Sequence, residues 1–244
     1  MAAPSSLVAV LASASIACAI LLLKRRKRPL ARMLQSTVPD CPFALLHAWL
    51  SEAEEELGLY ARAMVLATYS PDDGPTARTV LMQRCEAAGV IQFGTTQGSQ
   101  KMRNLREEPR CELVFRWGDR QVRIRGLARI EGDAVSKAAF QTLDRGAQLS
   151  LHVLNQGRLI DEETHTKAAA EVARLSTELS ERPVSRPSSY TAVSIVPTSF
   201  EFYQGGGGEL GYVQHDRFLY VADCGGNKLR SDQQVFRLVG RLQA

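Results

Sequence analysis

The sequence has little of what many folds and active sites depend on. Aromatic residues make up only 7% of its 244 residues, and cysteine occurs five times. The cysteines are scattered and never spaced as Cys-x-x-Cys: Cys18, Cys41, Cys85, Cys111 and Cys224. The four histidines have no partner at metal-ligand spacing: His47, His152, His165 and His215. A Walker A loop and a His-Glu-x-x-His motif are also absent. These absences argue against a disulfide scaffold, a metal site and a P-loop, and they fit a reducing compartment.

Charge is unevenly distributed along the chain. Thirty Lys and Arg against 26 Asp and Glu give a net charge of +4, but residues 1–32 hold six of the bases and no acid. The remainder therefore carries a net charge of −2. A domain with this balance is not predicted to be a general nucleic-acid binder.

The N-terminal segment predicts a membrane anchor. Residues 7–23 contain no charge and consist largely of Leu, Val, Ile and Ala, and Lys-Arg-Arg-Lys-Arg follows at once. About 17 apolar residues are the practical minimum for a spanning helix. A secretory signal carries its bases ahead of the apolar run, whereas here they follow it, so the positive-inside rule places the rest of the chain in the cytosol. We expect residues 1–28 to form a single-pass anchor. The alternative is a buried core helix, and the protein is cytoplasmic if the segment is not inserted.

The remaining residues predict a linker and one domain. Residues 29–40 lie between Pro29 and Pro39 and read as a linker, and 41–244 as the domain. An apolar stripe at steps of three and four predicts a helix after Asp40, which we expect to be its N-cap. Further helices are expected at 99–107, 133–143, 146–156 and 161–181. Strand-forming runs are expected at 64–69, 77–82, 90–95, 111–117, 121–126, 193–203, 218–221 and 235–242. Many short strands with few helices predict a mainly β fold with α (α+β), an antiparallel barrel with peripheral helices.

One stretch predicts an anion site. Residues 95–101 read Thr-Thr-Gln-Gly-Ser-Gln-Lys and lead into a predicted helix. Arg78 lies at the start of the predicted strand at 77–82. Free N–H groups at a helix start, together with hydroxyls and bases, favour a phosphate. Alone, this pattern also fits a solvated basic loop.

Several segments occur in an order that is hard to obtain by chance. They include Ala-Arg-Thr-Val-Leu-Met at 77–82, Gly-Ser-Gln-Lys-Met-Arg-Asn-Leu at 98–105, Arg-Gln-Val-Arg-Ile-Arg-Gly at 120–126, Glu-Phe-Tyr-Gln-Gly at 201–205 and His-Asp-Arg-Phe-Leu-Tyr at 215–220. With residues 42–50 and 241–242, they resemble the pyridoxamine 5′-phosphate oxidase family. That family is built on the split barrel that binds flavin mononucleotide (FMN). The resemblance covers roughly residues 41–244.

The resemblance implies a set of FMN contacts. The corresponding residues in this chain are Arg78, Thr95, Lys101, Gln121, Gln156, Tyr203 and Arg217. Arg78 and Lys101 would neutralise the FMN phosphate, while Gln121 and Gln156 offer amides to the flavin ring. Four positions depart from the family pattern: Gly94, Gln100, Gly157 and Tyr203 stand where the family has Tyr, Arg, Ser and Trp.

The resemblance also implies a reaction. In the family, a hydride passes from C4′ of pyridoxamine or pyridoxine 5′-phosphate to flavin N5, and O₂ is reduced to H₂O₂ as pyridoxal 5′-phosphate forms. It implies catalytic roles for His215 and Arg217, and substrate contacts for Gln83 and His215. Where the family holds the substrate's phosphate and ring, however, this chain has Gln83, Ala139, Leu143, Ala147 and Val213. Arg84 faces away from Gln83 on a strand, so Arg145 is the nearby cation that could compensate, if the helix register slips by two residues.

Three hypotheses therefore remain open at the level of sequence. The first is an FMN-dependent oxidase acting on pyridoxamine or pyridoxine 5′-phosphate. The second keeps the flavin but takes a substrate without a phosphate. The third is a membrane-tethered split barrel that binds flavin, a pyridoxal derivative or a partner protein without turnover. The resemblance implies a homodimer with FMN in clefts between two subunits, and a dimerisation region at about 190–244.

Overall fold

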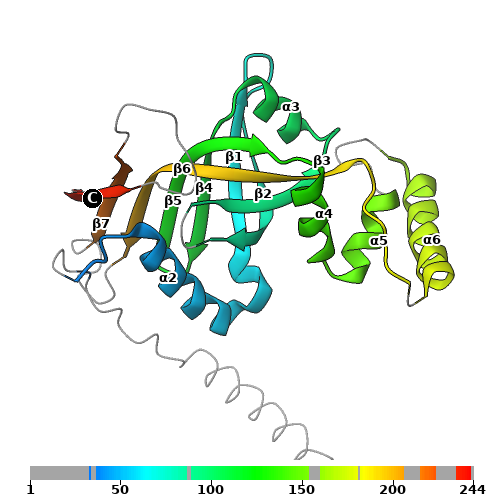
Figure 1. The fold of residues 1–244 in the computed structure, drawn as a ribbon, viewed down its shortest axis with the longest axis horizontal. Helices are drawn as coiled ribbons and strands as arrows, with labels where there is room; N and C mark the ends of the chain where they lie inside the picture. The colour runs from blue at the N-terminus through cyan, green and yellow to red at the C-terminus, as the bar shows by residue number, and fades with distance from the viewer. Residues whose placement is uncertain are drawn as a thin grey trace, which may run out of the picture.

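The described residues form one antiparallel sheet of eight strands with helices around it (Figure 1). The computed structural model describes residues 33, 37–86, 89–153, 160–180, 182–205, 215–223 and 235–242. The strands are β1 (Ala63–Ser70), β2 (Gly74–Cys85), β3 (Ile91–Thr96), β4 (Arg110–Trp117), β5 (Arg120–Ile130), β6 (Tyr190–Gln204), β7 (Asp216–Ala222) and β8 (Phe236–Arg241). The helices are α2 (Pro42–Leu57), the 3₁₀ turn η1 (Gly58–Arg62), α3 (Gln100–Glu107), α4 (Asp133–Gln141), α5 (Arg145–Val153) and α6 (Glu162–Leu179).

Six of these strands close into a barrel. Their order is β3-β2-β1-β4-β5-β6, and β3 pairs back onto β6 from Ile91↔Ile195 to Thr96↔Tyr190. The second half of β6 pairs instead with β7, from Ser199↔Val221 to Gln204↔Asp216, and β8 continues the sheet beyond it. A single long strand thus serves both the barrel and an extension, which confirms the predicted α+β antiparallel split barrel.

At Gly126, β5 and β6 lie too close together for a side chain. The register between the two strands shifts between Arg125 and Gly126, and Gly126 pairs with Pro197. A Cβ at residue 126 would lie 2.7 Å from the carbonyl oxygen of Val196 and 2.6 Å from Cγ2 of Ile195. Only glycine therefore permits this bulge, which bends the strand pair between barrel and extension.

The core is built from alternating strand residues and one face of α2. Phe115, Val122 and Phe202 are fully buried, as the period of two in β4 and β5 predicts. On α2, Phe43 and Trp49 pack edge-on against the rings of Phe200 and Phe202, with centroids 5.0 and 5.3 Å apart. The predicted cap is wrong: the N-cap of α2 is Cys41, not Asp40, and no side chain caps the helix.

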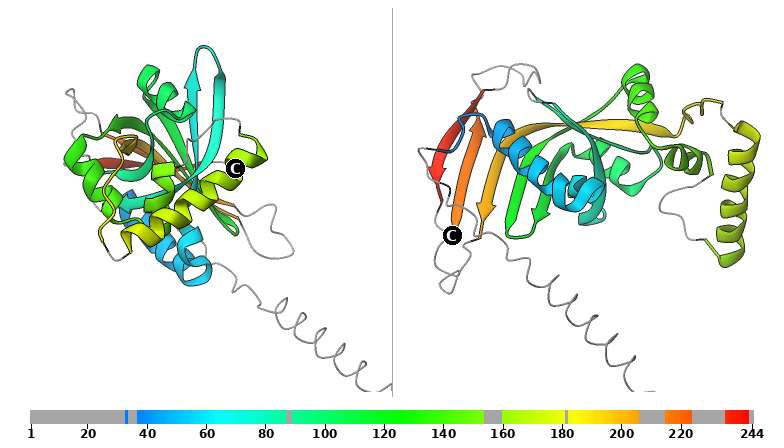
Figure 2. Two further views of the ribbon diagram at one scale, coloured as in Figure 1. Left: turned by 90° about the vertical axis from the view of Figure 1, so that its right-hand side faces the viewer. Right: turned by 90° about the horizontal axis from the view of Figure 1, so that it is seen from below.

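Three helices gather at the end of the molecule opposite β7 and β8. Both further views show α4, α5 and α6 beside the start of β6 (Figure 2). Ala139, Phe140 and Leu149 form a second buried cluster with Tyr190. Residues Val172, Leu175 and Leu179 of α6 pack against this cluster. The cluster therefore anchors Tyr190, the first residue of β6, against the helices.

The segment before α2 contacts the extension. The backbone N–H of Met33 donates to Oδ2 of Asp216 at 2.8 Å, and the hydroxyl of Tyr220 donates to the carbonyl oxygen of Pro39 at 2.7 Å. The predicted anchor at residues 7–23 lies outside the described residues. Among the residues that are described, no helix is long and apolar enough to cross a membrane.

Candidate active site

One cavity collects several of the predicted site residues. Its volume is about 560 Å³, within the range of about 300–1,000 Å³ that is typical of small-ligand sites. Its walls are formed by β2, β3, α3, the turn between α4 and α5, α5 itself and the first residue of β6. The lining residues are Arg78, Thr79, Val80, Leu81, Gln83, Gly94, Thr95, Lys101, Leu143, Ala147, Ser150, Leu151 and Tyr190.

Arg78 is fixed by hydroxyl groups rather than by a carboxylate. Its guanidinium donates to Oγ1 of Thr68 and Oγ1 of Thr76, both at 2.7 Å, and to the carbonyl oxygen of Leu66 at 3.3 Å. The amide of the buried Asn104 donates to the same two hydroxyls at 3.2 and 3.1 Å. Within the described residues Arg78 forms no ion pair, and desolvation by burial lowers the pKa of its guanidinium. Its charge is thus held in place but not neutralised.

Lys101 brings a second cation to the same end of the cavity. It lies in the first turn of α3, and its Nζ donates to Oγ1 of Thr95 at 3.2 Å. Burial lowers the pKa of the Lys101 ammonium, and the charge of Arg78 lowers it further. The hydroxyls of Thr95 and Ser99 lie 3.3 Å apart just before the helix. Two mutually repelling cations beside a helix N-terminus form a site suited to a phosphate.

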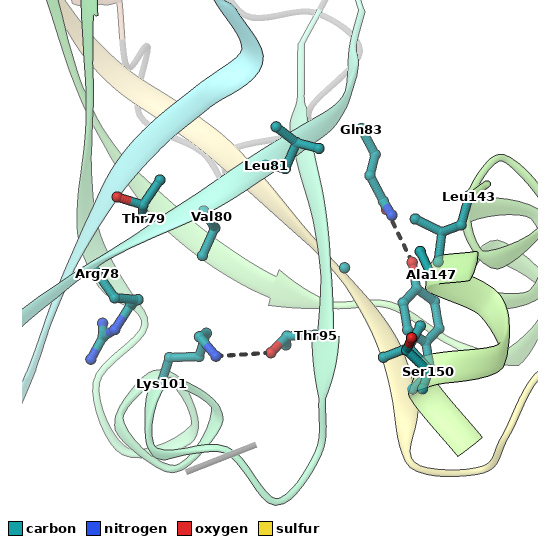
Figure 3. A pocket seen from close by; sticks show the side chains of 13 residues that line it. Arg78, Thr79, Val80, Leu81, Gln83, Thr95, Lys101, Leu143, Ala147 and Ser150 are labelled. Atoms are coloured by element: carbon teal, nitrogen blue, oxygen red, sulfur yellow. Dashed lines mark hydrogen bonds between the residues drawn. The ribbon is translucent and has the colours of Figure 1, made fainter. Parts of the chain in front are cut away.

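The opposite end of the cavity is uncharged. Figure 3 shows Arg78, Lys101 and Thr95 on one side, and Gln83, Leu143 and Ala147 on the other. Arg145 does not compensate, because its guanidinium donates to the carbonyl oxygens of Ser180 and Arg182. Arg84 pairs with Glu86 and is 62% exposed. Arg145 therefore does not replace the missing cation, and Leu143 and Ala147 themselves line this end of the cavity.

Other predicted site residues lie together on a different part of the sheet. Gln121 pairs with Tyr203 across β5 and β6, and Tyr203 pairs with Arg217 across β6 and β7, so the three form one cross-strand row. The hydroxyl of Tyr203 lies 2.9 Å from Nδ1 of His215. None of these four residues lines the cavity. Gln156 and Val213 lie outside the described residues, and Ala139 is buried in the helical cluster.

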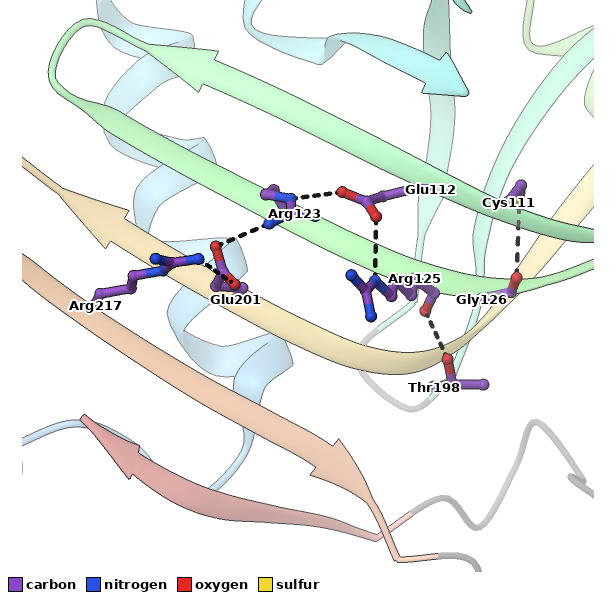
Figure 4. A network of polar contacts seen from close by, with 8 residues as sticks. All are labelled: Cys111, Glu112, Arg123, Arg125, Gly126, Thr198, Glu201 and Arg217. Carbon is purple, nitrogen blue, oxygen red and sulfur yellow. Dashed lines mark hydrogen bonds and ion pairs between the residues drawn. The ribbon is translucent and has the colours of Figure 1, made fainter. Parts of the chain in front are cut away.

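Arg217 belongs to a chain of ion pairs across this row. It contacts Glu201 at 3.0 Å, Glu201 contacts Arg123 at 3.3 Å, and Arg123 contacts Glu112 at 2.5 Å (Figure 4). Burial raises the pKa of Glu112, but hydrogen bonds from Arg123 and Arg125 outweigh it and lower the pKa overall. The flavin and catalytic roles of this group remain predictions.

Sequence reasoning missed two residues that line the cavity and two that lie behind it. Thr68 accepts a hydrogen bond from Arg78, and Asn104 donates in turn to Thr68, while Tyr190 and Ser150 line the uncharged end. Asn104 lies three residues after Lys101 in α3, so the two side chains are neighbours on the helix, and this spacing could have predicted that Asn104 lies near the site. No sequence pattern pointed to Tyr190, because only the pairing of β3 with β6 brings this residue to the cavity.

The cysteines beside the barrel do not offer a nucleophile. Burial raises the pKa of both the Cys85 and the Cys111 thiol to about 12. These thiols stay protonated at neutral pH, and a protonated thiol is a poor nucleophile. The chemistry of the site therefore rests on its cations, hydroxyls and amides.

Comparison with known proteins gives the family. The model of the family described as "Pyridoxamine 5′-phosphate oxidase" matches residues 50–178, more than half of the chain. The chain belongs to the pyridoxamine 5′-phosphate oxidase family. The pyridoxine/pyridoxamine 5′-phosphate oxidase of Rubrobacter xylanophilus is 35% identical over 202 residues, which cover 82% of this chain and 89% of the relative. That of Azorhizobium caulinodans is 34% identical over 186 residues, covering 75% and 84%. Membership places the chain among flavin-binding oxidoreductases.

Solved structures agree in fold. PhzG from Burkholderia lata 383, in complex with tetrahydrophenazine-1-carboxylic acid, superposes with a TM-score of 0.71 at 20% identity, covering 89% of this chain and all of that one. A pyridoxamine 5′-phosphate oxidase-related, FMN-binding protein from Nostoc punctiforme gives a TM-score of 0.62 at 18% identity, covering 83% and 100%. At such identities the likeness shows the split-barrel fold alone.

Proposed function

We propose that this protein is an FMN-dependent oxidoreductase that holds the FMN phosphate between Arg78 and Lys101. The observation that carries the proposal is the pair of partly buried cations that line one end of the cavity beside the N-terminus of α3, where burial lowers the pKa of each. A phosphate ester carries a charge of about −2 near neutral pH and would relieve their repulsion. The named relatives and the FMN-binding neighbour support the same cofactor.

In this proposal the chain positions its ligands and the flavin supplies the redox chemistry. Bound FMN would accept a hydride from an amine or alcohol carbon and pass the electrons to O₂. Thr68 and Thr76 keep the guanidinium of Arg78 aimed at the phosphate, so little is lost to side-chain ordering on binding. Val80, Leu81 and Leu143 line the cavity with apolar surface that limits water around the reacting groups.

A matched pair of arginine variants tests the cofactor site. Arg78 and Arg84 lie on the same strand, but only Arg78 lines the cavity, whereas Arg84 is exposed. Arg78→Ala should weaken FMN binding by about tenfold to a hundredfold, since a charge-assisted hydrogen bond contributes about 1.5–3 kcal/mol. Arg84→Ala should leave it unchanged. FMN titration followed by flavin fluorescence measures both, and equal affinities in the two variants would refute the phosphate assignment.

We also propose that two copies of the chain complete each site. The row of Gln121, Tyr203 and Arg217 lies outside the cavity of its own chain, and the family resemblance implies that FMN lies between subunits. Mixed dimers test this. Arg78→Ala and Arg217→Ala proteins should each bind FMN poorly alone. After unfolding and refolding together, random pairing should restore about a quarter of the wild-type sites. No recovery would contradict a shared site.

Oxidation of pyridoxamine or pyridoxine 5′-phosphate to pyridoxal 5′-phosphate is the reaction that the relatives' names suggest. We propose a reaction of this type, with an amine or alcohol on a pyridine-like ring as substrate. Anaerobic mixing of the FMN-loaded protein with pyridoxamine, pyridoxine and their phosphates should bleach the flavin band at about 450 nm with at least one of them. A flavin that none of the four reduces would leave the non-catalytic binding role as the better account.

The sequence also supports a proposal on localisation. We propose that residues 7–23 anchor the protein in a membrane, with the bases at 24–28 and the oxidoreductase domain on the cytosolic side. The full chain should sediment with membranes and resist alkaline extraction, whereas a variant with Leu11→Arg and Leu22→Arg should be released. An extractable wild-type protein would contradict the anchor.

A further inference from the structure

The uncharged end of the cavity is built around a hydrogen-bonded pair. The hydroxyl of Tyr190 donates to Oε1 of Gln83 at 3.0 Å. Tyr190 is only 1% exposed, and its ring packs edge-on against Phe140 with centroids 5.4 Å apart. Burial raises the pKa of this phenol, which is therefore neutral at physiological pH. The pair is thus rigid and carries no charge.

Gly94 is what allows Tyr190 to take this position. A Cβ at residue 94 would lie 2.2 Å from the Tyr190 hydroxyl oxygen and 2.6 Å from its ring. The phenol of Tyr190 therefore fills the space that a side chain at residue 94 would occupy. The two residues come from β3 and β6, which pair at Gly94↔Ala192 and Thr96↔Tyr190.

The pair has donor and acceptor capacity that its own hydrogen bond does not use. Among the described residues, the Nε2 group of Gln83 has no hydrogen-bond partner, and the Tyr190 oxygen can accept one more bond. The hydroxyl of Ser150 lies in the same walls and donates to the carbonyl oxygen of Gly146 at 2.8 Å, so it can only accept a bond from a ligand, and Leu143, Ala147 and Leu151 contribute apolar surface. A phosphate dianion placed here would lose its hydration without gaining a cation, which is strongly unfavourable. A neutral hydroxyl, amide or carbonyl group would be satisfied.

We propose that Gln83 and Tyr190 are the specificity-determining pair of this cavity, and that they select an unphosphorylated ring ligand with a neutral polar substituent. This inference rests on the proposed function in one respect: FMN occupies the end of the cavity at Arg78 and Lys101. It departs from the substrates in the relatives' names, which are phosphate esters. The structural reason is that Gln83 supplies an amide at a wall where no described lining residue is charged.

Two ligands that differ only by the phosphate test the proposal. Pyridoxine and pyridoxine 5′-phosphate are titrated into the full-length, FMN-loaded protein, and binding is measured by calorimetry with flavin content recorded on each sample. The wild type should bind pyridoxine at least as tightly as its phosphate. Gln83→Lys should shift the preference toward the phosphate by about tenfold or more, because it creates a charge-assisted contact. Gln141→Lys is the matched control: the same substitution at an exposed position outside the cavity should leave the preference unchanged.

A third variant isolates the phenol. Tyr190→Phe keeps the ring but removes the donor to Gln83, so it should weaken pyridoxine binding several-fold and leave flavin content unchanged. Tighter wild-type binding of the phosphate by tenfold would overturn the proposal, and so would a failure of all variants to bind either ligand. Loss of flavin from every sample would instead refute the proposed function, so the two failures are distinguishable.

Discussion

Gly94→Ala probes the cavity with the smallest possible change. The new methyl group would lie 2.2 Å from the Tyr190 hydroxyl oxygen, whereas ordinary contact begins at about 3.4 Å. The phenol must therefore move by about 1 Å. It cannot do so freely, because Tyr190 is 1% exposed and its ring packs on Phe140. The substitution should push Tyr190 off Gln83 and disturb the helical cluster behind it.

The expected cost follows from two contributions. Overpacking a buried site costs about 1–3 kcal/mol. Loss of the Tyr190–Gln83 hydrogen bond adds about 0.5–1.5 kcal/mol. We expect Gly94→Ala to lower the free energy of unfolding by about 1.5–4.5 kcal/mol. For a chain of this size, each kcal/mol lowers the melting temperature by about 2–4 °C.

Urea unfolding of the full chain measures this cost against a control. Gly98→Ala is the control, because a Cβ at residue 98 meets nothing within 4 Å. The cost of Gly94→Ala should largely disappear in a Tyr190→Ala background, since the clashing ring is then gone. The reasoning is refuted if Gly94→Ala costs no more than Gly98→Ala, or if its cost is unchanged without the phenol.

Three further predictions concern the charged groups. Burial and the charge of Arg78 lower the pKa of Lys101, so Lys101 loses its proton at a lower pH than an exposed lysine. FMN affinity, measured by fluorescence titration from pH 7 to 10, should therefore fall as the pH rises through that pKa. Lys101→Arg should remove the fall. Asn104→Ala removes the hydrogen bonds to Thr68 and Thr76 and should weaken FMN binding about threefold to tenfold. Arg103→Ala, on the exposed face of α3, should leave FMN binding unchanged. Identical FMN titrations of the two variants would contradict a role of Asn104 in positioning Arg78. Glu112 has a lowered pKa in the folded protein, so its stabilising effect is present above the unfolded pKa of about 4.3 and is lost as pH falls through the folded value. Glu112→Gln should therefore reduce the slope of the free energy of unfolding against pH on the acid side. An unchanged slope would contradict a stabilising role for Glu112.

The sequence predicted the elements that depend on local pattern. The alternation in 111–117 and 121–126 predicted β4 and β5 because each has one buried face. Boundaries were less accurate where long-range pairing extends a strand. β5 continues past the bulge at Gly126 to Ile130 because it also pairs with the first half of β6. β2 begins at Gly74 because the whole length of β1 pairs with it.

The part of the candidate site that was predictable from the sequence consists of charged residues within recognisable motifs. Arg78 and Lys101 stand in recognisable segments, and the structure places both in one cavity. The role of Tyr190 was not predictable, because it begins a strand about a hundred residues after Gly94 and meets it only through barrel closure. Whether Arg145 replaces the missing cation was not predictable either, because the carbonyl oxygens that it binds, those of Ser180 and Arg182, follow α6 much later in the chain.

The relative affinity of the full chain for FMN and riboflavin tests the central claim most directly. The two ligands differ only by the phosphate that Arg78 and Lys101 are proposed to hold. If each cation contributes about 1.5–3 kcal/mol, FMN should bind roughly a hundredfold to ten-thousandfold more tightly than riboflavin. Arg78→Ala should reduce that ratio by about tenfold or more. Equal affinity for the two flavins, or no binding of FMN, would contradict the account.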